Sequence, residues 1–314
     1  MKYRYNKKRI ALVVLVVFAL IFCIFALNKK DYEPVVETAA PTQTVTQAQK
    51  AIPQITSPEC KTALLYCVNT GEILYAQNTD ARIATASLVK LVTASVALEY
   101  FNSDEVFTVG TERNLVLPYS SLCYIEIGQR LTLKDLLCGL LVSSGNDAAY
   151  TIAAQCARKL EPDADMTDAE AVELFCGRMN LLAEKLGMEH SGFVNPDGMD
   201  EDGQYTTAAD LVKIAKYALS FPEIREIVGS HSVDVTFVSG ETMSWTSTNR
   251  MLDPSDEFYN KNVFGIKTGT TSGAGTCLIA SFYADNKMYI SVVSGCELDR
   301  ERYEITSKLI SAVS

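Results

Sequence analysis

The sequence predicts an α/β protein of the α+β type, in which an antiparallel sheet is flanked by helices and carries a mostly helical subdomain. Three observations support this prediction. Short alternating apolar segments, typical of strands, lie toward both ends of the folded part of the chain. Helical periodicity dominates between them. Finally, 48% of the 314 residues are apolar, which is enough to bury a full core.

The N-terminal region predicts a membrane anchor. Residues 1–9 carry five Lys or Arg side chains, and residues 10–27 form an uninterrupted apolar run, long enough to cross a bilayer core at about 1.5 Å per residue. We therefore expect a cytoplasmic tail, a single transmembrane signal anchor and an extracytoplasmic remainder at the cell membrane. A cleaved signal peptide, with a possible site near residues 38–40, would instead give a secreted protein. Residues 28–59, rich in Thr, Gln, Ala and Pro, predict a flexible linker to a folded domain at 60–314.

Charge and cysteine content narrow the function. The whole chain has a formal net charge of −10 and its first 30 residues carry seven positive and no acidic side chains, so the remainder carries −17. Such an acidic domain argues against nucleic acid as a partner. Of the nine cysteines, most lie in apolar segments, which favours buried free thiols over a disulfide framework but leaves pairing open. With only two histidines and no Cys-x-x-Cys pair, we expect no metal site.

The elements follow in order along the chain. Residues 61–78 predict a β-hairpin with its turn at Asn69-Thr70-Gly71, and "TASLVKLVTASVALEY" at 85–100 predicts a helix that is apolar on nearly every side. Residues 131–160 predict two helices interrupted at Ser143-Ser144-Gly145. Further helices are expected at 167–187 and 205–220, strands at 231–247, 263–268, 276–283 and 288–295, and a last helix at 299–313.

Ser87 and Lys90 stand out within the apolar helix. They are three residues apart and therefore share one face. In one interpretation Ser87 caps the helix and Lys90 extends along its alkyl stem to solvent. In the other, the amine is buried beside the hydroxyl, which needs an adjacent base to act as a nucleophile. The pair alone does not decide between them.

Two more polar clusters interrupt apolar surroundings. Ser144 and Asn146 lie at the break between two helices, and Lys267-Thr268-Gly269-Thr270 ends an apolar strand. Each cluster alone could be an ordinary turn or strand exit. Together with Ser-Leu-Val-Lys at 87–90, these clusters match the motifs of class A β-lactamases and penicillin-binding proteins, both in residue type and in order along the chain.

The chain thus resembles the low-molecular-mass penicillin-binding proteins, which are serine D-alanyl-D-alanine carboxypeptidases, from about residue 62 to 297. Connecting segments such as "TGEILYAQN", "LTLKDLLCGLLVSSGNDAA" and "GFVNPDGMDEDGQYTTAADL" extend the resemblance beyond the three motifs. It implies the β-lactamase/transpeptidase-like fold and a penicillin-binding catalytic domain at 60–314. Many members of that family add a C-terminal β-rich domain and a C-terminal membrane helix, whereas this chain ends soon after its last predicted strand.

The resemblance also implies roles for individual residues. Ser87 would attack the carbonyl between the last two D-alanines of a peptidoglycan stem peptide, Lys90 would take its proton, and Ser144 would relay a proton to the leaving amine. Burial beside Lys267 would lower the pKa of Lys90 enough for this task. No cofactor is implied, and β-lactam antibiotics would act as covalent inhibitors.

The remaining implied roles concern substrate binding. Asn146 would hold the amide of the acyl group, and Lys267 and Thr268 would bind the terminal carboxylate. Gly269 would allow close backbone approach, and the backbone N–H groups of Ser87 and Thr270 would form the oxyanion hole. The sequence does not indicate a second cation for the carboxylate.

Other functions remain as alternatives. A class A-like β-lactamase shares the three motifs, but its Glu-x-x-x-Asn segment occurs nowhere in this chain. A non-catalytic receptor for penicillin or muropeptides would tolerate loss of the base, yet every polar position is present. Endopeptidase or transpeptidase action uses the same residues and is not separated by sequence, whereas two isolated histidines cannot supply the ligands of a metal carboxypeptidase.

Overall fold

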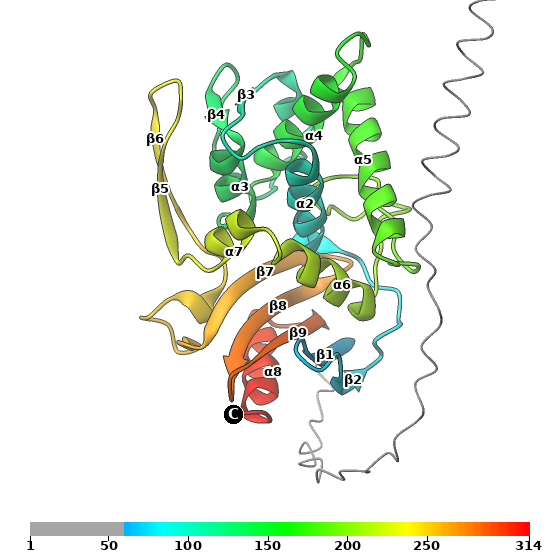
Figure 1. Ribbon diagram of the computed structural model, residues 1–314, viewed down its shortest axis with the longest axis vertical. Helices are drawn as coiled ribbons and strands as arrows, with labels where there is room; N and C mark the ends of the chain where they lie inside the picture. The colour runs from blue at the N-terminus through cyan, green and yellow to red at the C-terminus, as the bar shows by residue number, and fades with distance from the viewer. Residues whose placement is uncertain (1–59) are drawn as a thin grey trace, which may run out of the picture. The chain divides into compact units, whose positions relative to one another are not determined.

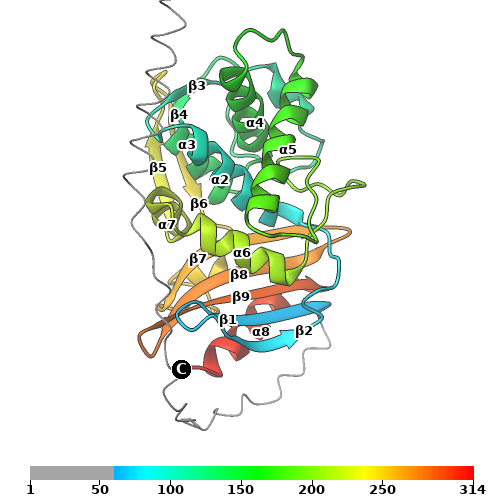
Figure 2. The ribbon, with the colours of Figure 1, turned by 45° about the vertical axis from the view of Figure 1, so that its right-hand side comes forward.

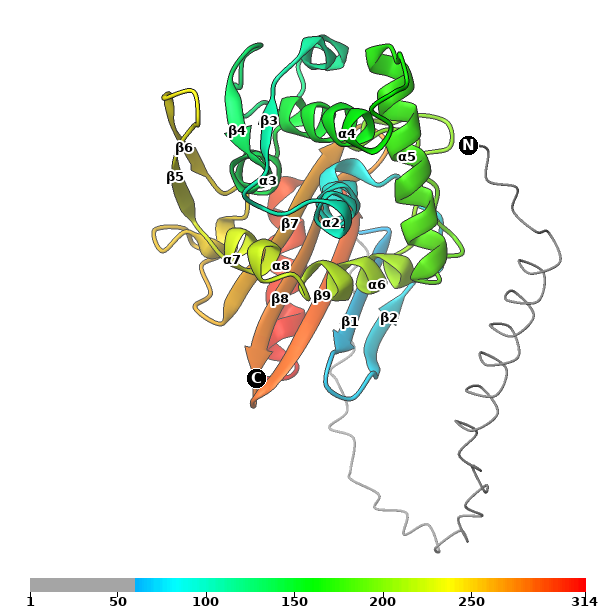
Figure 3. The ribbon, with the colours of Figure 1, turned by 45° about the horizontal axis from the view of Figure 1, so that its top comes forward.

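The computed structural model describes residues 60–314, which contain a five-stranded antiparallel sheet. The strand order is β2-β1-β9-β8-β7, so β1 from the start of this region pairs with β9 from its end, as Figures 1 and 3 show. This arrangement confirms the predicted sheet built from both ends of the folded part. The strands are β1 (Thr62–Cys67), β2 (Ile73–Gln77), β7 (Val263–Thr271), β8 (Gly275–Ala284) and β9 (Lys287–Cys296).

Both faces of the sheet are covered. Helix α8 (Asp299–Ser311) packs on one face, and α6 (Ala208–Ala218) packs on the other together with the helical subdomain (Figure 2). Because they are enclosed on two sides, the central strands are buried along almost their whole length and are nearly continuously apolar. The sheet therefore separates two apolar cores, one under α8 and a larger one under the helices.

The helical subdomain surrounds one central helix, α2 (Lys90–Tyr100), which contacts α3, α4, α5 and α6. Its all-round apolar surface is buried from Lys90 to Ala97, as the sequence predicted. Capping boxes at Thr132 and Thr167 begin α3 and α5 by satisfying their first backbone N–H groups. The surrounding helices are α3 (Leu133–Leu141), α4 (Asn146–Leu160) and α5 (Asp168–Lys185).

Three expectations about the elements are corrected. A single sheet was predicted, but β3 (Val106–Thr108) pairs with β4 (Arg130–Thr132), and β5 (Ser232–Thr236) with β6 (Thr242–Thr246), as two separate two-stranded sheets (Figure 1). The 205–220 helix is followed by a further short helix that begins at a proline, α7 (Pro222–Val228). The 85–100 stretch begins as a 3₁₀ turn, η1 (Ala86–Val89), before α2 starts.

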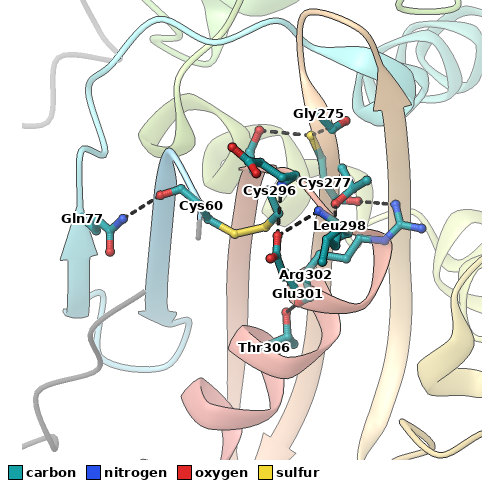
Figure 4. The surroundings of a disulfide bond; sticks show 12 residues. Cys60, Gln77, Gly275, Cys277, Cys296, Leu298, Glu301, Arg302 and Thr306 are labelled. Atoms are coloured by element: carbon teal, nitrogen blue, oxygen red, sulfur yellow. Dashed lines mark hydrogen bonds between the residues drawn. A yellow bond between two sulfur atoms is a disulfide. The ribbon is translucent and has the colours of Figure 1, made fainter. Parts of the chain in front are cut away.

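The pairing of the cysteines, which the sequence left open, involves one pair in the described region. Cys60 and Cys296 form a disulfide that joins the chain two residues before β1 to the last residue of β9 (Figure 4). The other six cysteines of the described region are free and buried, as their apolar settings suggested. The bridge closes two neighbouring strands whose ends are 236 residues apart in sequence.

The predicted tail, anchor and linker at residues 1–59 lie outside the described residues. Within 60–314, no helix combines the length and the apolar character that a membrane crossing requires.

Candidate active site

Ser87 lies in the 3₁₀ turn η1, and two glycines from elsewhere in the chain approach the backbone of this turn closely. A Cβ at Gly198 would lie 1.9 Å from the carbonyl oxygen of Ala86, and one at Gly269 would lie 3.1 Å from the backbone nitrogen of Ser87. Ala86 itself takes a positive φ of 42°, an uncommon conformation for a residue with a side chain. The turn is therefore shaped by the loop and the strand packed against it, and it leaves Ser87 partly exposed.

Lys90 follows on the first turn of α2 and is completely buried. Its Nζ lies 2.7 Å from Ser87 Oγ, 2.7 Å from Asn146 Oδ1 and 2.9 Å from the carbonyl oxygen of Asp197. Burial lowers the pKa of Lys90 to about 8, although the carboxylates of Asp197 and Asp147 oppose this shift. The interpretation in which Lys90 reaches solvent is therefore wrong, since its amine is buried in contact with the Ser87 hydroxyl and its pKa is lowered.

Ser144 and Asn146 lie at the start of α4, where the predicted break occurs. Ser144 is buried and takes a positive φ of 64°, while Gly145 is the N-cap of the helix. The Asn146 side chain accepts from Lys90 and donates from Nδ2 to Asp197 Oδ2 at 2.7 Å. The break between α3 and α4 thus brings Asn146 to the amine of Lys90.

The third cluster lies on β7, with Lys267, Thr268 and Gly269 all buried. Lys267 donates to the carbonyl oxygen of Thr268 at 3.0 Å, and burial, with the positive charges of Lys90 and Arg302, holds its pKa well below its usual range. Gly269 packs against η1, as the close approach predicted for it requires.

Arg302, on α8, is a buried cation that sequence reasoning missed. Its Nη1 donates to the carbonyl oxygen of Gly269 at 3.1 Å and lies 3.4 Å from Thr270 Oγ1. It therefore holds the end of β7 from the face of the sheet that α8 covers. Its position more than thirty residues after the strand gave no local signal of this contact.

A cleft of about 190 Å³ opens over Ser87. Three of the predicted residues line it, namely Ser87, Asn146 and Thr270, whereas the other five are buried. The structure thus brings all three motifs to one place. The remaining lining residues, which sequence reasoning did not select, are Tyr119, Ser120, Ser121, Asp197, Gly198, Met199, Asp200, Thr271 and Ser272.

Asp200 ties two walls of this cleft together. Its carboxylate accepts from Thr271 Oγ1 and from the backbone N–H of Gly273, both at 2.7 Å. A Cβ at Gly273 would lie 3.0 Å from that carboxylate. The 195–204 loop is therefore fastened to the turn between β7 and β8, just beyond Thr270.

Substituting Gly198 with alanine is expected to displace Ser87. The residue has a φ of 93° and no space toward Ala86, so the added methyl group must push η1 or the loop away. We expect acylation of Ser87 by a penicillin to slow by at least about 10-fold, because a misplacement of about 1 Å can cost this much and more. Gly240→Ala is the matched control, since Gly240 also has a positive φ but nothing lies near its Cβ position. Equal losses in the two variants would contradict the steric argument.

The site pairs a serine hydroxyl with a buried lysine amine, an arrangement typical of the class of serine enzymes that use lysine in place of histidine. Residues 44–297 match the family model described as D-alanyl-D-alanine carboxypeptidase. The chain belongs to this family, which confirms the resemblance inferred from its motifs.

Individual relatives agree with this assignment. The chain is 31% identical over 256 residues to the D-alanyl-D-alanine carboxypeptidase DacF of Bacillus subtilis, covering 80% of this chain and 61% of that protein. It thus spans about three fifths of the length of the curated relatives that it matches first.

Solved structures show the same fold. The Streptomyces K15 DD-transpeptidase superimposes with a TM-score of 0.74 at 27% identity, covering 82% of this chain and 97% of that one. Penicillin-binding protein D2 of Listeria monocytogenes, solved in an ampicillin-bound form, gives 0.65 at 30% identity, covering 81% and 97%. The predicted β-lactamase/transpeptidase-like architecture is therefore confirmed.

Proposed function

We propose that the protein is a serine D-alanyl-D-alanine carboxypeptidase that removes the terminal D-alanine from peptidoglycan stem peptides and is acylated by β-lactams. The observation that carries this proposal is the 2.7 Å contact between Ser87 Oγ and the buried amine of Lys90, at the floor of an open cleft. Family membership supplies the class of substrate.

In the first half-reaction, Ser87 Oγ bonds to the carbonyl carbon of the penultimate D-alanine while its proton passes to Lys90. The negative charge that forms on the carbonyl oxygen is held by the backbone N–H groups of Ser87 and Thr270. The C–N bond then breaks, and the D-alanine amine leaves with a proton relayed through Ser144. Water subsequently cleaves the acyl-enzyme ester and returns the hydroxyl to Ser87.

Substrate binding is assigned to the other motif residues. Asn146 holds the amide of the acyl group, and Lys267 and Thr268 hold the terminal carboxylate. A second contact holds the Thr268 side chain in place, since its Oγ1 lies 2.5 Å from Thr248 Oγ1, within hydrogen-bonding distance. The N-terminal apolar run is assigned to the cell membrane as a single span, with the catalytic domain on the outer side.

The experiment is intact-mass spectrometry of the protein after incubation with penicillin and, separately, with diacetyl-lysyl-D-alanyl-D-alanine. We expect a long-lived penicilloyl adduct and release of free D-alanine, both absent in Ser87→Ala. Rapid penicillin turnover without an adduct would instead indicate a β-lactamase. If neither an adduct nor free D-alanine is detected, a non-catalytic binding protein is the explanation that remains.

A further inference from the structure

Asp197 is a buried acid beside the catalytic pair to which neither the sequence nor the family motifs gave a role. Only 1% of its surface is exposed, and it lies on the loop between α5 and α6, more than a hundred residues after Lys90. Its carbonyl oxygen accepts from Lys90, and its carboxylate accepts from Asn146 Nδ2 at 2.7 Å and from the backbone N–H of Met199 at 3.2 Å.

These contacts allow only one orientation of the Asn146 amide. A lysine amine at this site donates, and a carboxylate accepts. Asn146 stands between the two, so its Oδ1 must face Lys90 and its Nδ2 must face Asp197. Without the carboxylate, the amide could rotate and present its own N–H groups to the amine. Asp197 therefore determines which end of Asn146 meets Lys90.

Asp197 also contributes charge at the amine. Of the acidic groups that face Lys90, Asp197 acts most strongly, then Asp147, and both carboxylates favour its protonated form; the third group is the Cys123 thiol. The Asp147 carboxylate is already engaged by backbone N–H groups of the 123–125 segment. Burial raises the pKa of the Cys123 thiol well above its usual value, so that thiol stays neutral.

The other neighbours complete this electrostatic setting. Lys267 interacts with Lys90, and the positive charges of Lys90 and Arg302 both act on Lys267. The charge of Asp197 also acts on Tyr150 and Cys176. Burial raises the pKa of both groups, and it raises the pKa of Cys176 to about 12. Neither group ionises near neutral pH, so removing the charge of Asp197 acts mainly on Lys90.

We propose that Asp197 is a positioning residue of the Ser87–Lys90 pair, whose carboxylate holds the Asn146 amide with its oxygen toward Lys90 and places a negative charge beside that amine. This inference rests on the proposed function, because it concerns the acylation of Ser87. It predicts two separable effects, one on the pH at which the base becomes active and one on the rate once it is active.

The test measures the second-order rate constant for acylation by a fluorescent penicillin against pH in the full-length protein. This profile reports the ionisation of the free enzyme. Asp197→Asn keeps an acceptor for Asn146 but loses the charge, so its acid limb is expected to move to lower pH by roughly 0.5–1 unit, which raises the fraction active below the midpoint about 3–10-fold. Asp197→Ala loses both and is expected to show the same shift with a plateau lowered at least about 10-fold.

Two further variants make the result decisive. Asp197→Glu retains the charge in a different position and should keep the wild-type midpoint with a reduced plateau. Asp202→Asn removes an exposed charge from the same loop and should leave the whole profile unchanged. An unshifted midpoint in Asp197→Asn, or an equal shift in Asp202→Asn, would overturn the inference. If the wild-type protein is not acylated at all, the proposed function fails instead.

Discussion

Replacing Lys90 with methionine is expected to reduce acylation of Ser87 by about 10²–10⁴-fold, the range that a general base contributes. Methionine fills a similar volume without an amine, so Ser87 keeps its place but loses the group 2.7 Å away that takes its proton. The residue is completely buried and methionine nearly matches it in volume, so we expect the variant to remain folded. Stopped-flow acylation by a penicillin measures the loss, and circular dichroism checks the fold.

Lys267→Met provides the matched comparison, because it removes the other buried lysine of the site. If Lys267 binds the substrate carboxylate, its loss should weaken binding of the penicillin more than it slows the chemical step. Lys90→Met should do the reverse. A variant without Lys90 that acylates at the wild-type rate would show that another group acts as the base.

Removing the Cys60–Cys296 disulfide is expected to lower the free energy of unfolding by about 2–5 kcal/mol. The bridge closes a loop of 236 residues, and a cross-link over so long a loop restricts the unfolded chain strongly. The double variant Cys60→Ser, Cys296→Ser should therefore show a lower denaturation midpoint than the oxidised wild-type protein. Urea denaturation followed by tryptophan fluorescence is suitable, since the single Trp245 is buried.

The control for this experiment is Cys277→Ala, which removes a buried free thiol from β8 without breaking a cross-link. We expect it to cost no more than about 1–2 kcal/mol, as for a small loss of packing. A reducing agent should lower the midpoint of the wild-type protein but not that of the double serine variant. Equal midpoints for wild-type protein and double variant would mean that the bridge does not limit stability.

The sequence predicted most of the fold because its signals are local. Alternation marked the strands, and the helix break at Ser143-Ser144-Gly145 followed from residues that favour turns. The same signals do not specify partners. The alternating segments β5 and β6 were recognised as strands, but alternation does not tell whether a hairpin joins the central sheet.

The motifs predicted most residues of the site, but residues that reach the site only through long-range contacts were missed. Ser87, Lys90 and Asn146 were found, and the structure places the Lys90 amine in contact with both of the others. Asp197 and Arg302 carry no local pattern and reach the site only through the loop between α5 and α6 and through α8. The 3₁₀ turn at Ala86–Val89 was missed for the same reason, since glycines more than a hundred residues away impose it.

The disulfide also determines how a pulling force would travel through the domain. A tension applied to the chain ahead of residue 60 meets a covalent bond to the end of β9 two residues before β1 begins. The pull is then shared with a central strand that is hydrogen-bonded on both sides, instead of acting on β1 alone. Stretching from that end should therefore not separate β1 from its neighbours one hydrogen bond at a time. The oxidised domain should resist mechanical load applied through the preceding chain.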